Sequence, residues 1–247
     1  MENPPVAYEN LKFLNSDACR SARLGLEYLH PEIVMNEHRI KSTLVLFGSA
    51  RIPAPEHAGS AVNKHLAEFT PYYEEARKLA EIISCESQTE HGCEFVIITG
   101  GGGGIMEAGN RGAKDAGCKS IALNITLPHE QKPNPYVTED LCFRFHYFNM
   151  RKMHFMRRAK AVCIFPGGFG TLDELFEMLT LIQTGKIPPI PVILFGTEFW
   201  KKLIDWDCLV ESGLISPEDV RIFTFCEDAE EACKIIKDFY ASEGIRH

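Results

Sequence analysis

The segment EFVIITGGGGGIMEAGNRGA (residues 94–113) joins a short apolar run to five consecutive glycines and then to a stretch that predicts a helix. A strand, a glycine turn and a helix in this order are typical of the carboxyl edge of a parallel α/β sheet, where ligands bind. Glycine has no Cβ, so a ligand can approach its backbone closely. We therefore expect a ligand near this turn.

The same alternation extends along the chain. Apolar runs predict strands at residues 43–47, 94–98, 120–125, 142–148, 161–165, 191–195 and 220–225. Helices are expected at residues 71–83, 105–116, 150–160, 171–183 and 228–241. Continuous rather than alternating apolarity indicates strands that are covered on both faces. The predicted fold class is α/β, a doubly wound (Rossmann-like), mostly parallel sheet with helices on both faces.

The first 41 residues do not follow this alternation. Ala18, Ala22, Leu26 and Leu29 fall at helical spacing before Pro31. They predict an N-terminal helical extension over residues 1–41 that packs on the domain or on a partner subunit. Residues 42–247 are expected to form one Rossmann-like catalytic domain, because a chain of 247 residues is short enough for a single core.

Composition excludes several classes of protein. The net charge of -8 argues against a nucleic-acid-binding protein, which needs an excess of Lys and Arg. The nine cysteines contain no C-x-x-C pair, so zinc-finger and thioredoxin-type sites are not indicated. No apolar segment reaches the length of about 20 residues that a membrane helix needs. We expect a cytoplasmic protein with reduced thiols and no membrane partner.

A second glycine turn, PGGFGT (residues 166–171), follows the apolar run AVCIF and opens a predicted helix. Free backbone N–H groups and the positive end of a helix favour an anion. One glycine pair is as well explained by packing, but two such turns favour a phosphate or nucleotide. A Walker A loop would need Lys and Ser/Thr where Ile105 and Met106 stand. The dinucleotide-binding pattern G-x-G-x-x-G is also absent from both turns, so a NAD enzyme is a weak alternative.

Thr171 and Glu174 have the T-x-x-E spacing of a capping box, which alone is the simpler interpretation. A carboxylate beside a phosphate-binding turn would repel the anion, however, unless a cation or a sugar hydroxyl lies between them. Arg151 and Lys152 provide cations on the preceding predicted helix. An acid, a guanidinium and a phosphate turn therefore converge on one candidate site.

The sequence FPGGFGTLDELFE (residues 165–177) resembles the PGGxGTxxE motif of the LOG family, the cytokinin riboside 5′-monophosphate phosphoribohydrolases. That family is related to nucleotide 5′-monophosphate nucleosidases once called lysine decarboxylases. LFGSAR resembles the first strand and turn of the family, TGGGGGIMEA its glycine loop, LPHE a substrate-binding stretch, and MRK the end of its M-H-x-R-K motif. The resemblance covers residues 43–225.

The resemblance implies that Arg151 and Glu174 are the catalytic pair. It also implies substrate contacts from the two glycine turns and their neighbours: Gly101, Gly102, Gly103, Gly104, Glu130, Lys152, Gly167, Gly168, Phe169, Gly170, Thr171, Asp173 and Thr180. Phe148 and Asn149 replace the M-H of M-H-x-R-K, and the first glycine loop is one residue shorter than in plant members. Both departures leave the base specificity open.

The implied activity is an N-glycosidase, a nucleotide phosphoribohydrolase that splits a nucleoside 5′-monophosphate into free base and ribose 5-phosphate. The substrate is AMP-like or a cytokinin riboside monophosphate. Glu174 would stabilise oxocarbenium character on the ribose, and Arg151 would neutralise phosphate. No metal and no cofactor are expected, and the family resemblance suggests a homodimer. The alternative is a non-catalytic nucleotide or molybdenum-cofactor carrier, which has no need of the acid–guanidinium pair.

Overall fold

A seven-stranded parallel sheet forms the centre of the computed structural model, which describes residues 3–60, 63–89, 92–127 and 132–242. The strand order is β6-β5-β4-β1-β7-β8-β9. These strands are β1 (Thr43–Phe47), β4 (Val96–Thr99), β5 (Ser120–Ile125), β6 (Cys142–Phe145), β7 (Ala159–Ile164), β8 (Val192–Phe195) and β9 (Phe223–Cys226). Two short strands, β2 (Gln88–Thr89) and β3 (Gly92–Cys93), pair separately. The predicted parallel α/β sheet is confirmed.

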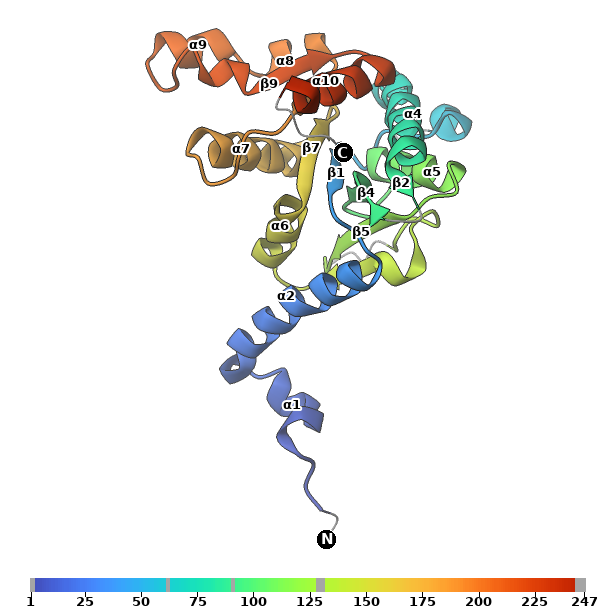
Figure 1. Ribbon diagram of the computed structural model, residues 1–247, viewed down its shortest axis with the longest axis vertical. Helices are drawn as coiled ribbons and strands as arrows, with labels where there is room; N and C mark the ends of the chain where they lie inside the picture. Colours follow the sequence, from blue (N-terminus) through green and yellow to red (C-terminus); the bar gives the residue numbers. More distant parts are fainter. Residues whose placement is uncertain (1–2, 61–62, 90–91, 128–131, 243–247) are drawn as a thin grey trace.

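Helices cover both faces of the sheet (Figure 1). The described helices are α1 (Leu11–Leu14), α2 (Arg20–Glu37), α3 (Lys64–Ala67), α4 (Thr70–Ser87), α5 (Ile105–Asp115), α6 (Phe148–Arg157), α7 (Phe169–Gln183), α8 (Thr197–Leu203), α9 (Trp206–Glu211) and α10 (Ala229–Ser242). One face packs against α4, α5 and α10, and the other against α2, α6, α7 and α8.

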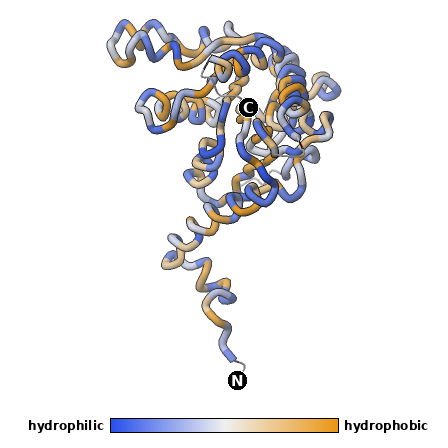
Figure 2. The backbone as a smooth tube through the Cα atoms, in the orientation of Figure 1, coloured by the Kyte–Doolittle hydropathy of each residue, from blue (hydrophilic) through white to orange (hydrophobic). Residues whose placement is uncertain are grey.

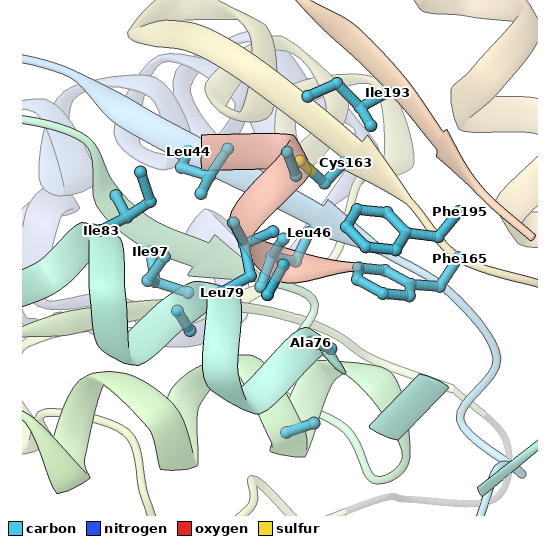
Figure 3. Close-up of a cluster of buried hydrophobic side chains, with 14 of the residues drawn as sticks. Leu44, Leu46, Ala76, Leu79, Ile83, Ile97, Cys163, Phe165, Ile193 and Phe195 are labelled. Carbon is cyan, nitrogen blue, oxygen red and sulfur yellow. The ribbon is translucent and has the colours of Figure 1, made fainter. Parts of the chain in front are cut away.

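Alternate strand residues point into two separate apolar clusters. Leu44 and Leu46 of β1 join the α4 side, where Leu79 packs on them (Figure 3). Val45 and Phe47 of the same strand join the α6 and α7 side. All five residues of β1 are buried, which explains its uninterrupted apolar sequence.

The chain order reverses at β1, because β4 to β6 extend the sheet on one side of β1 and β7 to β9 on the other. The connections that leave β1 and β7 consequently pass to opposite faces of the sheet. In open α/β sheets this switch point is where a crevice opens beyond the carboxyl ends of the strands. The fold therefore places its natural ligand site between the turns after β1 and β7.

Several predicted boundaries were wrong. The helix expected over residues 150–160 is α6, which ends at Arg157, and Lys160 lies in β7. The strand expected over residues 142–148 stops at Phe145, because Phe148 already begins α6. Pro31 was expected to follow the N-terminal helix but lies inside α2.

The N-terminal helices project from the body of the molecule (Figure 1). Leu26 and Leu29, expected to pack, are 59% and 51% exposed, whereas Met35 of α2 is buried against the sheet. Figure 2 shows hydrophobic stretches along this projecting arm, where Tyr8 and Leu11 are 75% and 70% exposed. The buried face of α2 is therefore displaced from the one that the apolar spacing predicted.

Two helical glycines provide a matched stability test. A Cβ on Gly112 of α5 would meet the carbonyl oxygen of Arg77 and lie 2.9 Å from Cβ of Ala80. We expect Gly112→Ala to lower the free energy of unfolding by roughly 1–3 kcal/mol through overpacking. Gly25→Ala in α2 adds a Cβ with no neighbour within 4 Å. That variant should gain up to about 1 kcal/mol from helix propensity. Urea denaturation measures the free energy of unfolding of both variants. Equal changes in the two would contradict the close packing at Gly112.

Candidate active site

A cavity of about 750 Å³ opens at the switch point between β1 and β7. Its wall includes the turn after β1, the start of α7 and side chains from α6 and α5. The lining residues are Phe47, Gly48, Ser49, Ala50, Arg51, Gly100, Met106, Phe148, Arg151, Gly167, Gly168, Phe169, Gly170, Thr171, Leu172, Asp173, Glu174 and Leu203. The second glycine turn and both members of the predicted catalytic pair thus line one cavity.

The second glycine turn leads directly into α7. Gly168 is the N-cap of α7, and no side chain caps this end. The backbone N–H groups of the first helical turn therefore remain open to a ligand, and the helix dipole adds positive potential there. A Cβ on Gly167 would collide with the side chain of Thr171, whereas a Cβ on Gly168 or Gly170 would meet nothing within 4 Å. The turn is tight at Gly167 and open at the other two glycines.

The capping-box interpretation of Thr171 and Glu174 is wrong. Because α7 begins at Phe169, Thr171 is the third helical residue and does not occupy the N-cap. Glu174 then lies more than one turn into the helix, where its carboxylate cannot reach back to cap the N-terminus. The position of the acid on α7 consequently has another explanation.

Glu174 is buried, with 7% of its surface exposed. Its Oε2 atom has no hydrogen-bond partner among the described residues. Burial raises the pKa of Glu174 to about 7, and the positive charges of Arg151 and Lys152 only partly oppose that rise. A carboxyl group with such a pKa exchanges its proton near neutral pH, which is the property of a catalytic acid or base.

Arg151 reaches the same cavity from α6. Its Nε donates a hydrogen bond of 2.8 Å to the carbonyl oxygen of Leu123, and its guanidinium carbon lies 5.3 Å from the ring centroid of Phe155. Burial lowers the pKa of Arg151, while the negative charge of Glu174 acts in the opposite direction. A Cβ on Gly100 would lie 2.5 Å from Nη2 of Arg151. Gly100 therefore makes room for the guanidinium.

The remaining glycines of the first loop pack against other parts of the protein. The N–H of Gly101 donates to Oγ1 of Thr99 at 3.0 Å. Gly104 has a positive φ of 62°, and a Cβ there would collide with the carbonyl oxygen of Ser49. Gly101, Gly102, Gly103 and Gly104 do not line the cavity. Close packing explains the glycine at positions 101 and 104, and substrate contact from these four residues stays a prediction.

Lys152 and Thr180 lie outside the cavity, in grooves between α6 and α7. Nζ of Lys152 pairs with Oδ2 of Asp173 and with Oε2 of Glu177, each at 2.9 Å. Asp173 lines both the cavity and these grooves. Oγ1 of Thr180 donates to the carbonyl oxygen of Phe176 at 2.6 Å. Glu130 falls outside the described residues, so its predicted substrate contact is not described.

Several cavity residues were not predicted as substrate contacts. Ser49 and Arg51 follow β1, Met106 is the second residue of α5, and Phe148 begins α6. The motif LFGSAR had marked the turn after β1, and the reversal of strand order at β1 would have assigned its residues to the site. The structure describes no group of three or more His, Cys, Asp or Glu side chains suited to a metal, nor any described helix long and apolar enough for a membrane span.

Comparison with known proteins finds one family model and several curated relatives that match this chain. Residues 106–236 match the family model described as possible lysine decarboxylase. Over 93 residues the chain is 36% identical to a cytokinin riboside 5′-monophosphate phosphoribohydrolase of Arabidopsis thaliana, covering 37% of this chain and 43% of that protein. A second Arabidopsis protein of that name is 28% identical over 148 residues, covering 58% of this chain and 67% of its own. The chain thus spans less than half of the first relative.

A solved structure shares the fold. The molybdenum cofactor binding protein from the phototrophic bacterium Rippkaea orientalis superposes with a TM-score of 0.51 over 81% of this chain and 97% of that one. Its sequence is 21% identical to this chain. The likeness extends to the arrangement of the sheet and helices.

The raised pKa of Glu174 makes a prediction about stability. Its carboxyl ionises near 4.5 in an unfolded chain and near 7 in the folded protein. Between these values the folded state binds more protons, so its free energy of unfolding falls as the pH rises. The Glu174→Gln side chain does not ionise, so the variant avoids this loss. Above pH 7 its free energy of unfolding should be higher than that of the wild type by up to ~3 kcal/mol.

Urea unfolding at about pH 5 and about pH 8 measures this difference. The advantage of Glu174→Gln should be much smaller at the acidic pH, where the wild-type carboxyl is largely protonated. Glu211→Gln at the exposed end of α9 is the control and should show no pH-dependent difference. An equal gain for Glu174→Gln at both pH values would contradict the shifted pKa.

Proposed function

Because the chain belongs to the family described as possible lysine decarboxylase, and because its cavity joins an open helix N-terminus to a buried carboxyl group, we propose that it is a nucleotide phosphoribohydrolase. The substrate is a nucleoside 5′-monophosphate, and the products are the free base and ribose 5-phosphate. The observation that carries the proposal is the buried Oε2 of Glu174, which has no hydrogen-bond partner in the described part of the chain and lies in a cavity that Arg151 also lines.

The 5′-phosphate binds at the start of α7 in this proposal. The N–H groups of Phe169, Gly170 and Thr171 belong to the first turn, which has no capping side chain. Three such donors and the helix dipole suit a phosphate monoester. Binding energy from the phosphate then positions the ribose carbon at the catalytic pair.

Glu174 and Arg151 act on the glycosidic bond. As the bond from C1′ to the base nitrogen breaks, its electron pair leaves with the base and positive charge develops on the ribose. Ionised Glu174 stabilises that charge and takes a proton from the water whose oxygen bonds to C1′. That proton neutralises the departing base, so water is the only co-reactant. Arg151 offsets the charge of the phosphate and of the leaving group.

Decarboxylation of an amino acid fits this site less well. Decarboxylation with pyridoxal phosphate needs an unprotonated lysine that can form a Schiff base. Burial alone would lower the pKa of Lys152, but the hydrogen bonds to Asp173 and Glu177 outweigh it and raise that pKa. The ammonium of Lys152 therefore stays charged, which supports hydrolysis.

We also propose a homodimer. Four large apolar side chains of α6 and α7 are exposed: Phe148 by 51%, Met153 by 42%, Phe169 by 93% and Phe176 by 41%. Exposed apolar clusters of this kind mark protein contacts. Phe148 and Phe169 line the cavity, so a second copy on this face would lie beside the site.

All nine cysteines are free, which supports a reducing, cytoplasmic location.

Substitution of Glu174 tests the activity. The wild type should release free base from at least one of AMP, GMP, CMP, UMP and isopentenyladenosine monophosphate, as chromatography detects. Glu174→Gln should lower kcat by about 10²-fold or more, because its side chain neither ionises nor accepts the proton of water. Glu211→Gln is the control and should retain full turnover. Binding of nucleotide without release by the wild type would instead support a non-catalytic carrier.

Gly170 tests the phosphate site. An added Cβ would meet nothing in the protein within 4 Å, so Gly170→Ala should fold normally. The new methyl group would crowd the bound phosphate and should raise KM for the nucleotide by about tenfold or more. The KM for the matching nucleoside, which lacks the phosphate, should change little. An unchanged nucleotide KM would place the phosphate elsewhere.

A further inference from the structure

Helix α2, in the N-terminal segment, holds α6 at three places. Figure 1 shows α2 beside α6, and hydrogen bonds join the two helices at the start, the middle and the end of α6. Helix α6 carries Arg151, whose guanidinium lines the cavity. The N-terminal helical extension is thus connected to a residue of the proposed site.

The first contact is made by the side chain of Glu27. Its Oε1 accepts a hydrogen bond of 2.7 Å from the N–H of His146, and its Oε2 accepts one of 3.2 Å from the N–H of Tyr147. Tyr147 is the N-cap of α6, and its own side chain does not cap the helix. A carboxylate at this end satisfies backbone donors and interacts favourably with the helix dipole. Glu27 therefore holds the two residues that lead into α6 from a different helix.

The second contact depends on Pro31. Proline has no N–H, so the carbonyl oxygen of Glu27, four residues earlier, loses its usual helical donor. Nε2 of His154, in the middle of α6, donates to that carbonyl oxygen at 3.0 Å. His154 is 1% exposed, and its ring stacks on Tyr28 of α2 at 5.7 Å between centroids. The proline within α2 thus exposes an acceptor that α6 uses.

The third contact lies at the end of α6. Glu32, which is 8% exposed, accepts from Nε of Arg157 at 2.8 Å and from Nη1 of Arg158 at 2.7 Å. Nη2 of Arg158 also donates to Oδ1 of Asn36 at 2.7 Å. Charge-assisted hydrogen bonds of this length are among the stronger polar contacts in proteins. Both ends of α6 are consequently fixed to α2.

A short path leads from the first contact to the site. Glu27 binds the N–H of Tyr147, and the carbonyl oxygen of Tyr147 accepts the N–H of Arg151 at 3.2 Å. Arg151 in turn donates from Nε to Leu123. We propose that α2 is a clamp that positions Arg151 for catalysis, with Glu27 as the main positioning residue. This inference rests on the proposed function and assigns the N-terminal helix a part in it.

The structure offers a matched control for Glu27. Glu75 of α4 accepts a hydrogen bond of 2.8 Å from the N–H of Ala229, the first residue of α10. Both glutamates therefore bind the start of a neighbouring helix, but α10 contributes no residue to the cavity. Loss of either side chain should lower the melting temperature by a similar few degrees.

The experiment compares Glu27→Ala with Glu75→Ala in the full chain, using AMP or whichever nucleotide of the panel releases base fastest. Glu27→Ala should lower kcat by about tenfold or more, because a small misplacement of a catalytic group is costly. Glu75→Ala should retain kcat. In an Arg151→Ala background, adding Glu27→Ala should change kcat by less than about twofold, since Glu27 acts through Arg151. Glu27→Gln, which keeps one acceptor, should recover part of the loss.

Equal losses of kcat in Glu27→Ala and Glu75→Ala, or a full additional loss in the Arg151→Ala background, would overturn the clamp. Amide hydrogen exchange over residues 148–153 gives a readout that needs no turnover. Exchange there should become faster in Glu27→Ala and stay unchanged in Glu75→Ala. If the wild type releases no base, the proposed function fails. The exchange rates then decide alone whether α2 holds α6, and equal rates in the two variants reject it.

Discussion

The site depends on one electrostatic arrangement. The buried carboxyl of Glu174 and the guanidinium of Arg151 share the cavity at the point where the order of strands reverses. Burial raises the pKa of Glu174 and lowers that of Arg151, while the charge of each opposes the effect on the other. A direct ion pair would relieve both groups. Arg151 instead contacts the carbonyl of Leu123 and the ring of Phe155, and none of the residues that the structure describes forms a hydrogen bond with Oε2 of Glu174. The fold thus places an acid and a cation on one cavity, and no hydrogen bond among the described residues joins Oε2 of Glu174 to the guanidinium.

The two glycine-rich turns support this arrangement in different ways. The turn before α7 leaves helical N–H groups open to the cavity. The loop after β4 is packed against the turn after β1, with Gly104 under the carbonyl of Ser49 and Gly100 beside Arg151. On our proposal, glycine is required before α7 for ligand access, whereas after β4 it allows close approach of one part of the protein to another. Composition alone does not distinguish these two requirements.

The sequence predicted what local patterns determine. The strands at residues 43–47 and 120–125 match β1 and β5 because their residues are almost all buried. The helix predicted at residues 150–160 was too long, because Arg158 and Lys160 have high helix propensity. In the structure Ala159 and Ala161 instead pair with β1 as part of β7. Helices α8 and α9, of seven and six residues, are too short for a clear period. Pro31 was wrongly predicted to follow the helix. Within α2 the hydrogen bond that proline cannot donate to the carbonyl oxygen of Glu27 is replaced by one from His154, which is distant in the sequence.

The site was only partly predictable for the same reason. The motif before Glu174 predicted a phosphate-binding turn, but the burial of that carboxyl depends on packing between strands and helices that are far apart in the chain. The two halves of the site also have separate structural support. The turn before α7 connects β7 directly to α7, whereas Arg151 stands on a helix that α2 holds from outside the sheet. On our proposal, changes in the N-terminal segment therefore act on Arg151 more than on the turn before α7. Because no described residue of α2 lines the cavity, substitutions at the contacts between α2 and α6 would, on our proposal, adjust Arg151 and leave the turn before α7 in place.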